Sequence, residues 1–133
     1  MTDIPDIRRI YRTTAEELLA GVVKRAQEIN ADPKYAWGIR QIWVFGSYLR
    51  PEVERLGDLD IAFELSQREN FDELWKARKS ARTTRPRNLA DEVGWPQKEI
   101  VRHLKNGKRS ISLHRVDEVL LLGCPYRVVY QDA

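Results

Sequence analysis

The apolar residues of this chain follow two spacings that predict alternating helices and strands. Between residues 18 and 26 they recur three or four positions apart, which is typical of one face of a helix. Residues 39–45 and 59–65 are instead short runs rich in β-branched and aromatic side chains, which is typical of strands. This alternation favours an α/β or α+β fold, in which helices flank a small mixed β-sheet.

The same reasoning gives approximate bounds for the remaining elements. Thr14 is expected to cap the first helix, because acidic residues follow it in what would be the first turn. Pro96 suits the first position of a later helix, and Asn106-Gly107 suits its end. The predicted helices are 14–30, 70–82 and 95–106, with shorter helical turns at 47–53, 89–93 and 117–122, and the predicted strands are 39–45, 59–65, 110–116 and 126–130.

Length and composition narrow the class of protein. A chain of 133 residues has the size of one ordinary domain, and no linker or internal repeat interrupts it, so residues 1–133 are expected to form a single domain. A net charge of +3 does not by itself indicate nucleic-acid binding. The single cysteine, Cys124, excludes a disulfide within the chain and fits a reducing cytoplasm. No apolar run approaches the roughly 18 residues of a membrane span, and no signal peptide is apparent.

Two aspartates stand in an otherwise apolar strand. Gly46-Ser47 ends the run 39–45, ten residues follow, and then come Asp58, Leu59 and Asp60. Alternate residues of a strand share a face, so both aspartates point the same way, about 7 Å apart along the backbone, while Leu59 points to the core. Two like charges at this separation need a compensating cation, and Mg²⁺ favours one or two carboxylates together with waters and phosphate oxygens.

The Gly-Ser turn supplies the other half of a phosphate site. Gly46 lets the backbone approach a ligand closely, and the turn N–H groups together with the Ser47 hydroxyl suit phosphate oxygens. The combination therefore indicates phosphoryl or nucleotidyl transfer.

The stretch GSYLRPEVERLGDLDIAF resembles the signature of the DNA polymerase β-like nucleotidyltransferase superfamily, and the small size resembles its minimal branch. The signature covers about a sixth of the chain, within a motif core at about 39–116. The order of predicted elements agrees with the family fold over roughly residues 13–116. The resemblance implies an NTP substrate and a Mg²⁺ or Mn²⁺ cofactor. By resemblance, the metal ligands are Asp58 and Asp60, the phosphate-binding residues are Gly46 and Ser47, and weaker candidates for phosphate contacts are Arg50 and Arg55.

The family also has a third carboxylate on a later strand, and this chain departs from that pattern. The corresponding position, between Ile111 and Leu113, is Ser112, and the next residue on the same face is His114. Three explanations stay open. His114 serves as base or ligand. Asp117 or Glu118 reaches in from the end of the strand. Alternatively, the site binds nucleotide and metal with little turnover. Glu64 is excluded, because it lies about 13 Å from Asp60 along the strand.

The resemblance suggests an enzyme that transfers a nucleoside monophosphate to a hydroxyl of a protein, an RNA or a small molecule. Small members of the family often pair with another protein, so the resemblance also suggests the antitoxin half of a toxin–antitoxin pair with a HEPN-type ribonuclease. One alternative is a catalytically weak protein on the same fold that acts by binding a nucleotide or a partner. Another is a nucleic-acid-binding module that uses two basic clusters, Lys76, Arg78, Lys79, Arg82, Arg85 and Arg87 in one and Lys105, Lys108 and Arg109 in the other.

Overall fold

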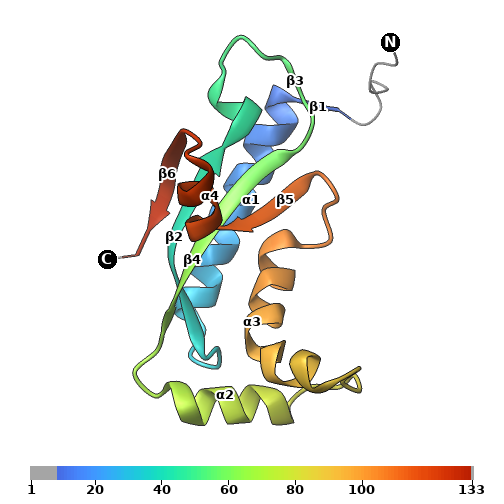
Figure 1. Cartoon of the computed structure of the whole chain (residues 1–133), viewed down its shortest axis with the longest axis vertical. Helices are drawn as coiled ribbons and strands as arrows, with labels where there is room; N and C mark the ends of the chain where they lie inside the picture. Colours follow the sequence, from blue (N-terminus) through green and yellow to red (C-terminus); the bar gives the residue numbers. More distant parts are fainter. Residues whose placement is uncertain (1–8, 133) are drawn as a thin grey trace.

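The computed structural model describes residues 9–132 and shows helices and strands alternating along the chain (Figure 1). The predicted mixed α and β class is confirmed. The elements are β1 (Ile10–Tyr11), α1 (Arg12–Ala31), β2 (Trp37–Phe45), the 3₁₀ turn η2 (Gly46–Leu49), β3 (Arg55–Leu56), β4 (Leu59–Gln67), α2 (Phe71–Ser80), α3 (Leu89–Lys105), β5 (Ile111–Arg115), α4 (Val116–Leu122) and β6 (Tyr126–Gln131).

Four strands form the main sheet in the order β5-β4-β2-β6. Strand β2 runs antiparallel to both β4 and β6, whereas β4 and β5 are parallel. The parallel pair requires a crossover connection, and α2 and α3 supply it. A second, two-stranded sheet pairs β1 with β3 and ties the start of α1 to the loop before β4. The main sheet is therefore mixed, as the sequence predicts.

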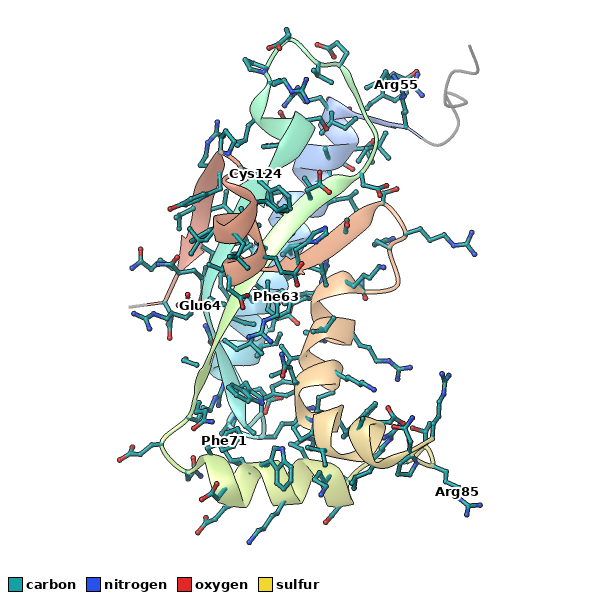
Figure 2. All side chains as sticks on the ribbon, in the orientation of Figure 1. Arg55, Phe63, Glu64, Phe71, Arg85 and Cys124 are labelled. Atoms are coloured by element: carbon teal, nitrogen blue, oxygen red, sulfur yellow. The ribbon has the colours of Figure 1, made fainter. Side chains whose placement is uncertain are left out.

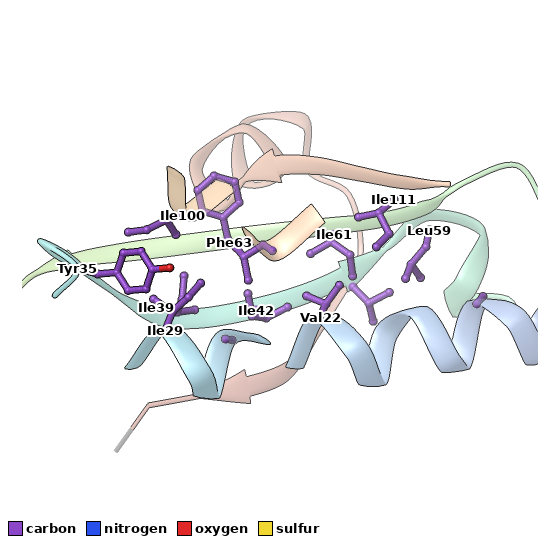
Figure 3. Close-up of a cluster of buried hydrophobic side chains, with 14 of the residues drawn as sticks. Val22, Ile29, Tyr35, Ile39, Ile42, Leu59, Ile61, Phe63, Ile100 and Ile111 are labelled. Atoms are coloured by element: carbon purple, nitrogen blue, oxygen red, sulfur yellow. The ribbon is translucent and has the colours of Figure 1, made fainter. Parts of the chain in front are cut away.

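Helices α1 and α3 bury one face of the sheet. Val22 and Ile29 of α1 point toward Ile42 of β2 and Ile61 of β4, and all four side chains are fully buried (Figure 3). Alternation along β4 sends its apolar residues to this face, as predicted, and each such side chain contributes roughly 1.5–3 kcal/mol of burial free energy. The fully buried residues that complete this cluster include Ala15, Ala26, Ile39, Val44, Leu56, Leu59, Ile100, Leu104 and Ile111.

The other face of the sheet carries a smaller apolar cluster and the polar residues of β4 and β5. Helix α4 crosses this face and packs Val116 and Val119 against Trp43, Phe45 and Ala62 (Figure 1). Because α4 has only 7 residues, it covers part of the face and leaves the rest open. The same face therefore holds the side chains of Asp60 and Ser112.

Helix α3 begins earlier than the sequence predicts. Residues 89–105 form one helix with Pro96 inside it, rather than a short turn followed by a helix that begins at Pro96. Its start lies earlier because Asn88 caps it, accepting a hydrogen bond from the backbone N–H of Asp91 at 2.8 Å. This cap helps to offset the cost of the missing proline N–H. The C-terminal expectation is confirmed, since Asn106 and Gly107 both have positive φ.

The Asp91 carboxylate anchors the first turn of α3. It accepts hydrogen bonds from Lys98 Nζ at 2.6 Å, from the backbone N–H of Arg87 at 2.9 Å and from Arg82 Nη2 at 2.8 Å. These hydrogen bonds lower the pKa of Asp91 well below its usual range, and the one from Lys98 has the largest effect. Two members of the first basic cluster therefore have structural partners, since Arg78 likewise holds Glu99 through Nη2 at 2.8 Å.

Helix α1 begins earlier than expected. Arg12 is its first residue and Tyr11 precedes it without a side-chain cap, so the expected cap at Thr14 is wrong. The short pairing of β1 with β3 explains the early start, because the backbone N–H of Arg12 donates to Glu54 O at 3.0 Å. The sequence predicts neither short strand, since two residues carry too little pattern to detect.

Candidate functional site

The turn at the end of β2 presents a backbone that favours glycine. Gly46 has a φ of 75°, a left-handed backbone conformation that is unfavourable for residues with a Cβ. A Cβ built on Gly46 would also overlap the Asp60 carboxylate. Gly46 therefore brings the η2 backbone into direct contact with Asp60, one of the two candidate metal ligands.

Asp60 lies at the centre of the site. It pairs with Phe45 of β2 on one side and with Ser112 of β5 on the other. Its side chain is half-buried, and this burial raises the pKa of Asp60 above its ordinary value; nearby His114 opposes the rise and Asp58 adds to it. Asp58 is exposed and directly precedes β4. The two aspartates thus interact electrostatically, and the half-buried one lacks full charge compensation.

Ser112 and His114 occupy the part of β5 that faces Asp60. Ser112 Oγ lies 2.8 Å from His114 Nε2, and His114 Nδ1 lies 3.5 Å from Glu118 Oε2 on α4. The register places Ser112 opposite Asp60, in the position predicted for the missing carboxylate. Asp117, another candidate, is exposed and pairs with Arg115 at 3.3 Å. Of the alternatives left open by the sequence, the structure therefore brings His114 into contact with Ser112, and Glu118 into contact with His114.

Arg12 holds the loop between the Gly-Ser turn and the aspartates. Its guanidinium donates to the backbone oxygens of Val53 at 3.0 Å, Tyr48 at 3.0 Å and Arg50 at 2.6 Å. One planar side chain thus fixes three carbonyls of the same loop. Sequence reasoning missed Arg12, because the charged segment around it has no periodic pattern and nothing local distinguishes one arginine from another.

The two predicted arginines of this loop have different surroundings. Arg50 is exposed and lines a pocket of about 390 Å³ together with Gly46, Leu49, Cys124 and Pro125. Arg55 lies over the ring of Tyr11, 4.2 Å from the ring centroid, and donates to the Arg9 carbonyl at 3.3 Å. Ser47 is partly buried in η2, one residue from the Gly46 turn. Arg50 is therefore beside the Gly-Ser turn, whereas Arg55 serves the pairing of β1 with β3.

The two basic clusters lie at different places. Arg85, a member of the first cluster in the loop after α2, lies at the opposite end of the molecule from Arg55 of β3 (Figure 2). The second cluster lies near the aspartates, because Leu59 N donates to Ser110 O at 2.7 Å, directly after Lys108 and Arg109. This proximity is one of backbone position, because the Lys108 side chain lines a pocket with residues of α1, on the opposite face of the sheet from Asp60.

Comparison with known families agrees with this geometry. The profile of the nucleotidyltransferase domain matches residues 23–129, which include the Gly-Ser turn, both aspartates and β5. The chain belongs to the nucleotidyltransferase domain family. No curated protein and no solved structure matches the chain. The recognition of a nucleotidyltransferase from the sequence is therefore confirmed.

Nucleotidyltransferase domains generally use an NTP and divalent metal ions. Within residues 9–132, no three or more His, Cys, Asp or Glu side chains gather closely enough to hold a metal ion by themselves. Among the helices in the described part of the chain, none has the length and apolar character needed to cross a membrane.

Proposed function

We propose that this nucleotidyltransferase domain transfers a nucleoside monophosphate from an NTP to an acceptor hydroxyl and releases pyrophosphate. The observation that carries the proposal is the contact between Gly46 and Asp60. A positive-φ glycine brings a bare backbone turn against a half-buried carboxylate, with a second carboxylate, Asp58, close by. A triphosphate can bind beside such a turn and such a pair of acids when a cation offsets the charges.

The donor set fits a hard divalent cation, Mg²⁺ or Mn²⁺. Asp58 and Asp60 offer carboxylate oxygens, and burial, helped by the nearby Asp58, raises the pKa of Asp60. Mg²⁺ is commonly held by one or two carboxylates, with water and substrate phosphates as its other ligands. When bound, the cation would offset the charge that develops on the phosphate oxygens.

The residues of the chain have distinct roles in this proposal. The backbone N–H groups of the turn at Gly46 and Ser47 donate to phosphate oxygens, and Arg50 adds positive charge at the mouth of the pocket. The apolar side of that pocket, formed by Leu49 and Pro125, accommodates the base or the sugar. In-line placement of the acceptor hydroxyl and the pyrophosphate leaving group supplies much of the rate.

The acceptor that we propose is a hydroxyl on a partner protein. Three consecutive leucines of α4 are exposed to 58%, 89% and 73%, which is unusual for large apolar residues next to a site. An exposed apolar surface of this kind supports a protein acceptor better than an RNA end. A HEPN-type ribonuclease is the partner implied by the family resemblance, and the chain would then act as its antitoxin.

Label transfer tests the proposal. The chain is incubated with each of the four NTPs labelled at the α-phosphate, Mg²⁺ or Mn²⁺, and the product of the neighbouring gene. We expect label on protein, and a loss of at least about 100-fold in Asp58→Asn and Asp60→Asn, as when preorganised electrostatic stabilisation is removed. Glu64→Gln is the matched control, because Glu64 lies on the same strand but pairs with Arg40 at 3.1 Å. Label transfer that is unchanged in both aspartate variants would contradict the proposed site.

A second candidate function is nucleotide or partner binding with little turnover. The observation that favours it is Ser112, a neutral residue opposite Asp60 where the family has a carboxylate. Calorimetric titration with each NTP and Mg²⁺ distinguishes the two functions. Binding that depends on Asp60, without pyrophosphate release or label transfer to any acceptor, supports this second candidate.

A further inference from the structure

We propose that the Ser112 hydroxyl is itself an acceptor, so that the chain nucleotidylates its own Ser112. This inference rests on the proposed function, because the NTP must first bind at Gly46 and Asp60. It goes beyond that function by naming a modification site within the chain. The observation behind it is that Ser112, His114 and Glu118 form a contact chain that begins beside Asp60.

The position of Ser112 suits a nucleophile. Ser112 and Asp60 are register partners on adjacent parallel strands, so their backbones are about 4.8 Å apart and their side chains share one face. A phosphate held beside the Gly46 turn and the Asp60 carboxylate would therefore lie near the Ser112 hydroxyl. Ser112 is partly exposed.

The surroundings of His114 suit a general base. Ser112 Oγ lies 2.8 Å from Nε2, Glu118 Oε2 lies 3.5 Å from Nδ1, and the Phe45 ring packs against the imidazole edge-to-face with its centroid 5.4 Å away. The tautomer that satisfies both polar contacts has its proton on Nδ1, directed at Glu118, so Nε2 accepts the hydrogen bond from Ser112. A hydroxyl next to a base that a third group orients is the usual arrangement of an activated serine.

The charged groups around the imidazole are acidic. Asp60 faces it from β4 and Glu118 faces it from α4. Glu118 would act as a positioning residue, because it touches His114 and neither the phosphate nor the hydroxyl.

The proposed step balances. Ser112 Oγ attacks the α-phosphorus of the NTP, a new Oγ–P bond forms, and the bond from the α-phosphorus to the bridging oxygen breaks. The hydroxyl proton moves to His114 Nε2, and pyrophosphate leaves with the electron pair of the broken bond. The product is a phosphodiester between Ser112 and the nucleoside, and no oxidant or further reactant is needed.

The test uses the full chain alone, with no acceptor protein. The chain is mixed with each NTP and Mg²⁺ or Mn²⁺, quenched with acid at a series of times, and its intact mass is recorded. We expect the mass of one nucleoside monophosphate to be added, and fragmentation of the peptide to place it on Ser112. Ser112→Ala should abolish the adduct and Ser112→Thr, which keeps a hydroxyl, should retain part of it. Ser110→Ala, two residues earlier in the chain, is the matched control and should label fully.

Two further variants test the base and its orientation. His114→Gln should slow labelling by about 100-fold or more, the usual contribution of general base catalysis. Glu118→Gln should slow labelling at saturating NTP while leaving the dissociation constant of the NTP unchanged, whereas a merely structural defect would change both. Asp117→Asn is the control, because Asp117 is the neighbouring carboxylate on α4 and pairs with Arg115 instead.

The outcomes separate this inference from the proposed function. Label transfer to another acceptor, or pyrophosphate release that depends on Asp60, without an adduct on Ser112 at any time, would overturn the inference and leave the function standing. The contact chain of Ser112, His114 and Glu118 would then act on the hydroxyl of an external acceptor. If no NTP binds and no label is transferred, both fail, and the failure lies with the proposed function. An adduct at Ser112 that requires His114 supports both.

Discussion

At the scale of single residues, the contact between the Gly46 backbone and the Asp60 carboxylate organises the site. A side chain at position 46 would conflict with this contact, because its Cβ would occupy the space of the carboxylate. Asp60 in turn is half-buried, so its ionised form is disfavoured by folding. Both residues therefore serve the site at some cost to local stability.

Asp60→Asn should stabilise the protein at neutral pH while it abolishes transfer. Burial raises the folded pKa of Asp60 above its unfolded value. The corresponding stability is fully present below the unfolded pKa, near 3.9, and is lost as the pH rises through the folded pKa. Thermal melts should therefore show a higher Tm for the variant at pH 7, and no difference below about pH 3.9, where both residues are neutral. A lower Tm at pH 7 would contradict this expectation.

Gly46→Ala should be more harmful than a glycine substitution elsewhere with similar backbone geometry. Gly107 has a φ of 68° and open space where a Cβ would lie, so Gly107→Ala isolates the cost of the left-handed backbone, about 1 kcal/mol. Gly46→Ala adds the overlap with Asp60 and should cost about 2 kcal/mol or more. Urea unfolding measures both variants. Only Gly46→Ala should also lose NTP binding, and equal costs with binding intact would argue against the contact.

Sequence reasoning reaches part of this residue-scale geometry. Strand alternation alone predicts that Asp60 faces away from the core, and the family pattern places Ser112 at the position of the third carboxylate. Neither predicts the contact of His114 with Glu118, because that contact depends on where α4 lies over the sheet. The role of Arg12 likewise cannot be predicted from local sequence, since its three carbonyl partners lie 36 to 41 residues away along the chain.

At the scale of elements, Arg12 joins the start of α1 to the loop that precedes β4. Arg12→Met should destabilise the protein by about 2 kcal/mol, the usual worth of hydrogen bonds from a charged donor. Arg12→Lys should recover only part of this, because an ammonium does not present the planar fork that reaches three carbonyls. Denaturant unfolding and amide exchange of residues 50–57 would measure the effect. Arg40→Met, which removes an exposed pair with Glu64, is the control and should cost less than about 0.5 kcal/mol.

The predicted elements differ from the structure where long-range contacts override local pattern. Pro96 is a good start signal, yet α3 begins seven residues earlier, at Leu89. The Asn88 cap and the three donors on Asp91 hold that first turn, and two of those donors come from the loop before it. The strands β2 and β4 are predictable because they combine length with β-branched residues, which the two-residue strands β1 and β3 cannot do.

At the scale of the whole molecule, the sheet order is the part of the fold that sequence leaves open. Local pattern predicts the strands, but not that β6 pairs with β2 or that β5 runs parallel to β4. Those pairings join segments far apart in the chain and are selected by packing of the complete core. The family resemblance, rather than periodicity, indicates the fold in which they occur.

The exposed leucines of α4 should tolerate substitution in the isolated chain. Leu121 is 89% exposed, so Leu121→Ser should change the free energy of unfolding by less than about 0.5 kcal/mol. Val119 is 1% exposed on the same helix, and Val119→Ala should cost about 2 kcal/mol through lost methyl burial and the cavity left behind. Denaturant unfolding compares the two. If the leucines contact a partner, Leu121→Ser should weaken that complex while leaving the chain folded.

The parallel register of β4 and β5 has a consequence for variation of this domain. A slip of β5 by one residue would replace Ser112 opposite Asp60 with Ile111 or Leu113 and turn the polar residues of the strand into the core. Insertions or deletions within β5 should therefore prevent folding, whatever their effect on the reaction. Length changes should instead accumulate at the exposed residues 83–86, which lie outside any helix or strand and between Arg82 and Arg87, the two loop donors to Asp91. In this domain, a chain whose Ser112 is out of register with Asp60 should therefore fail to fold.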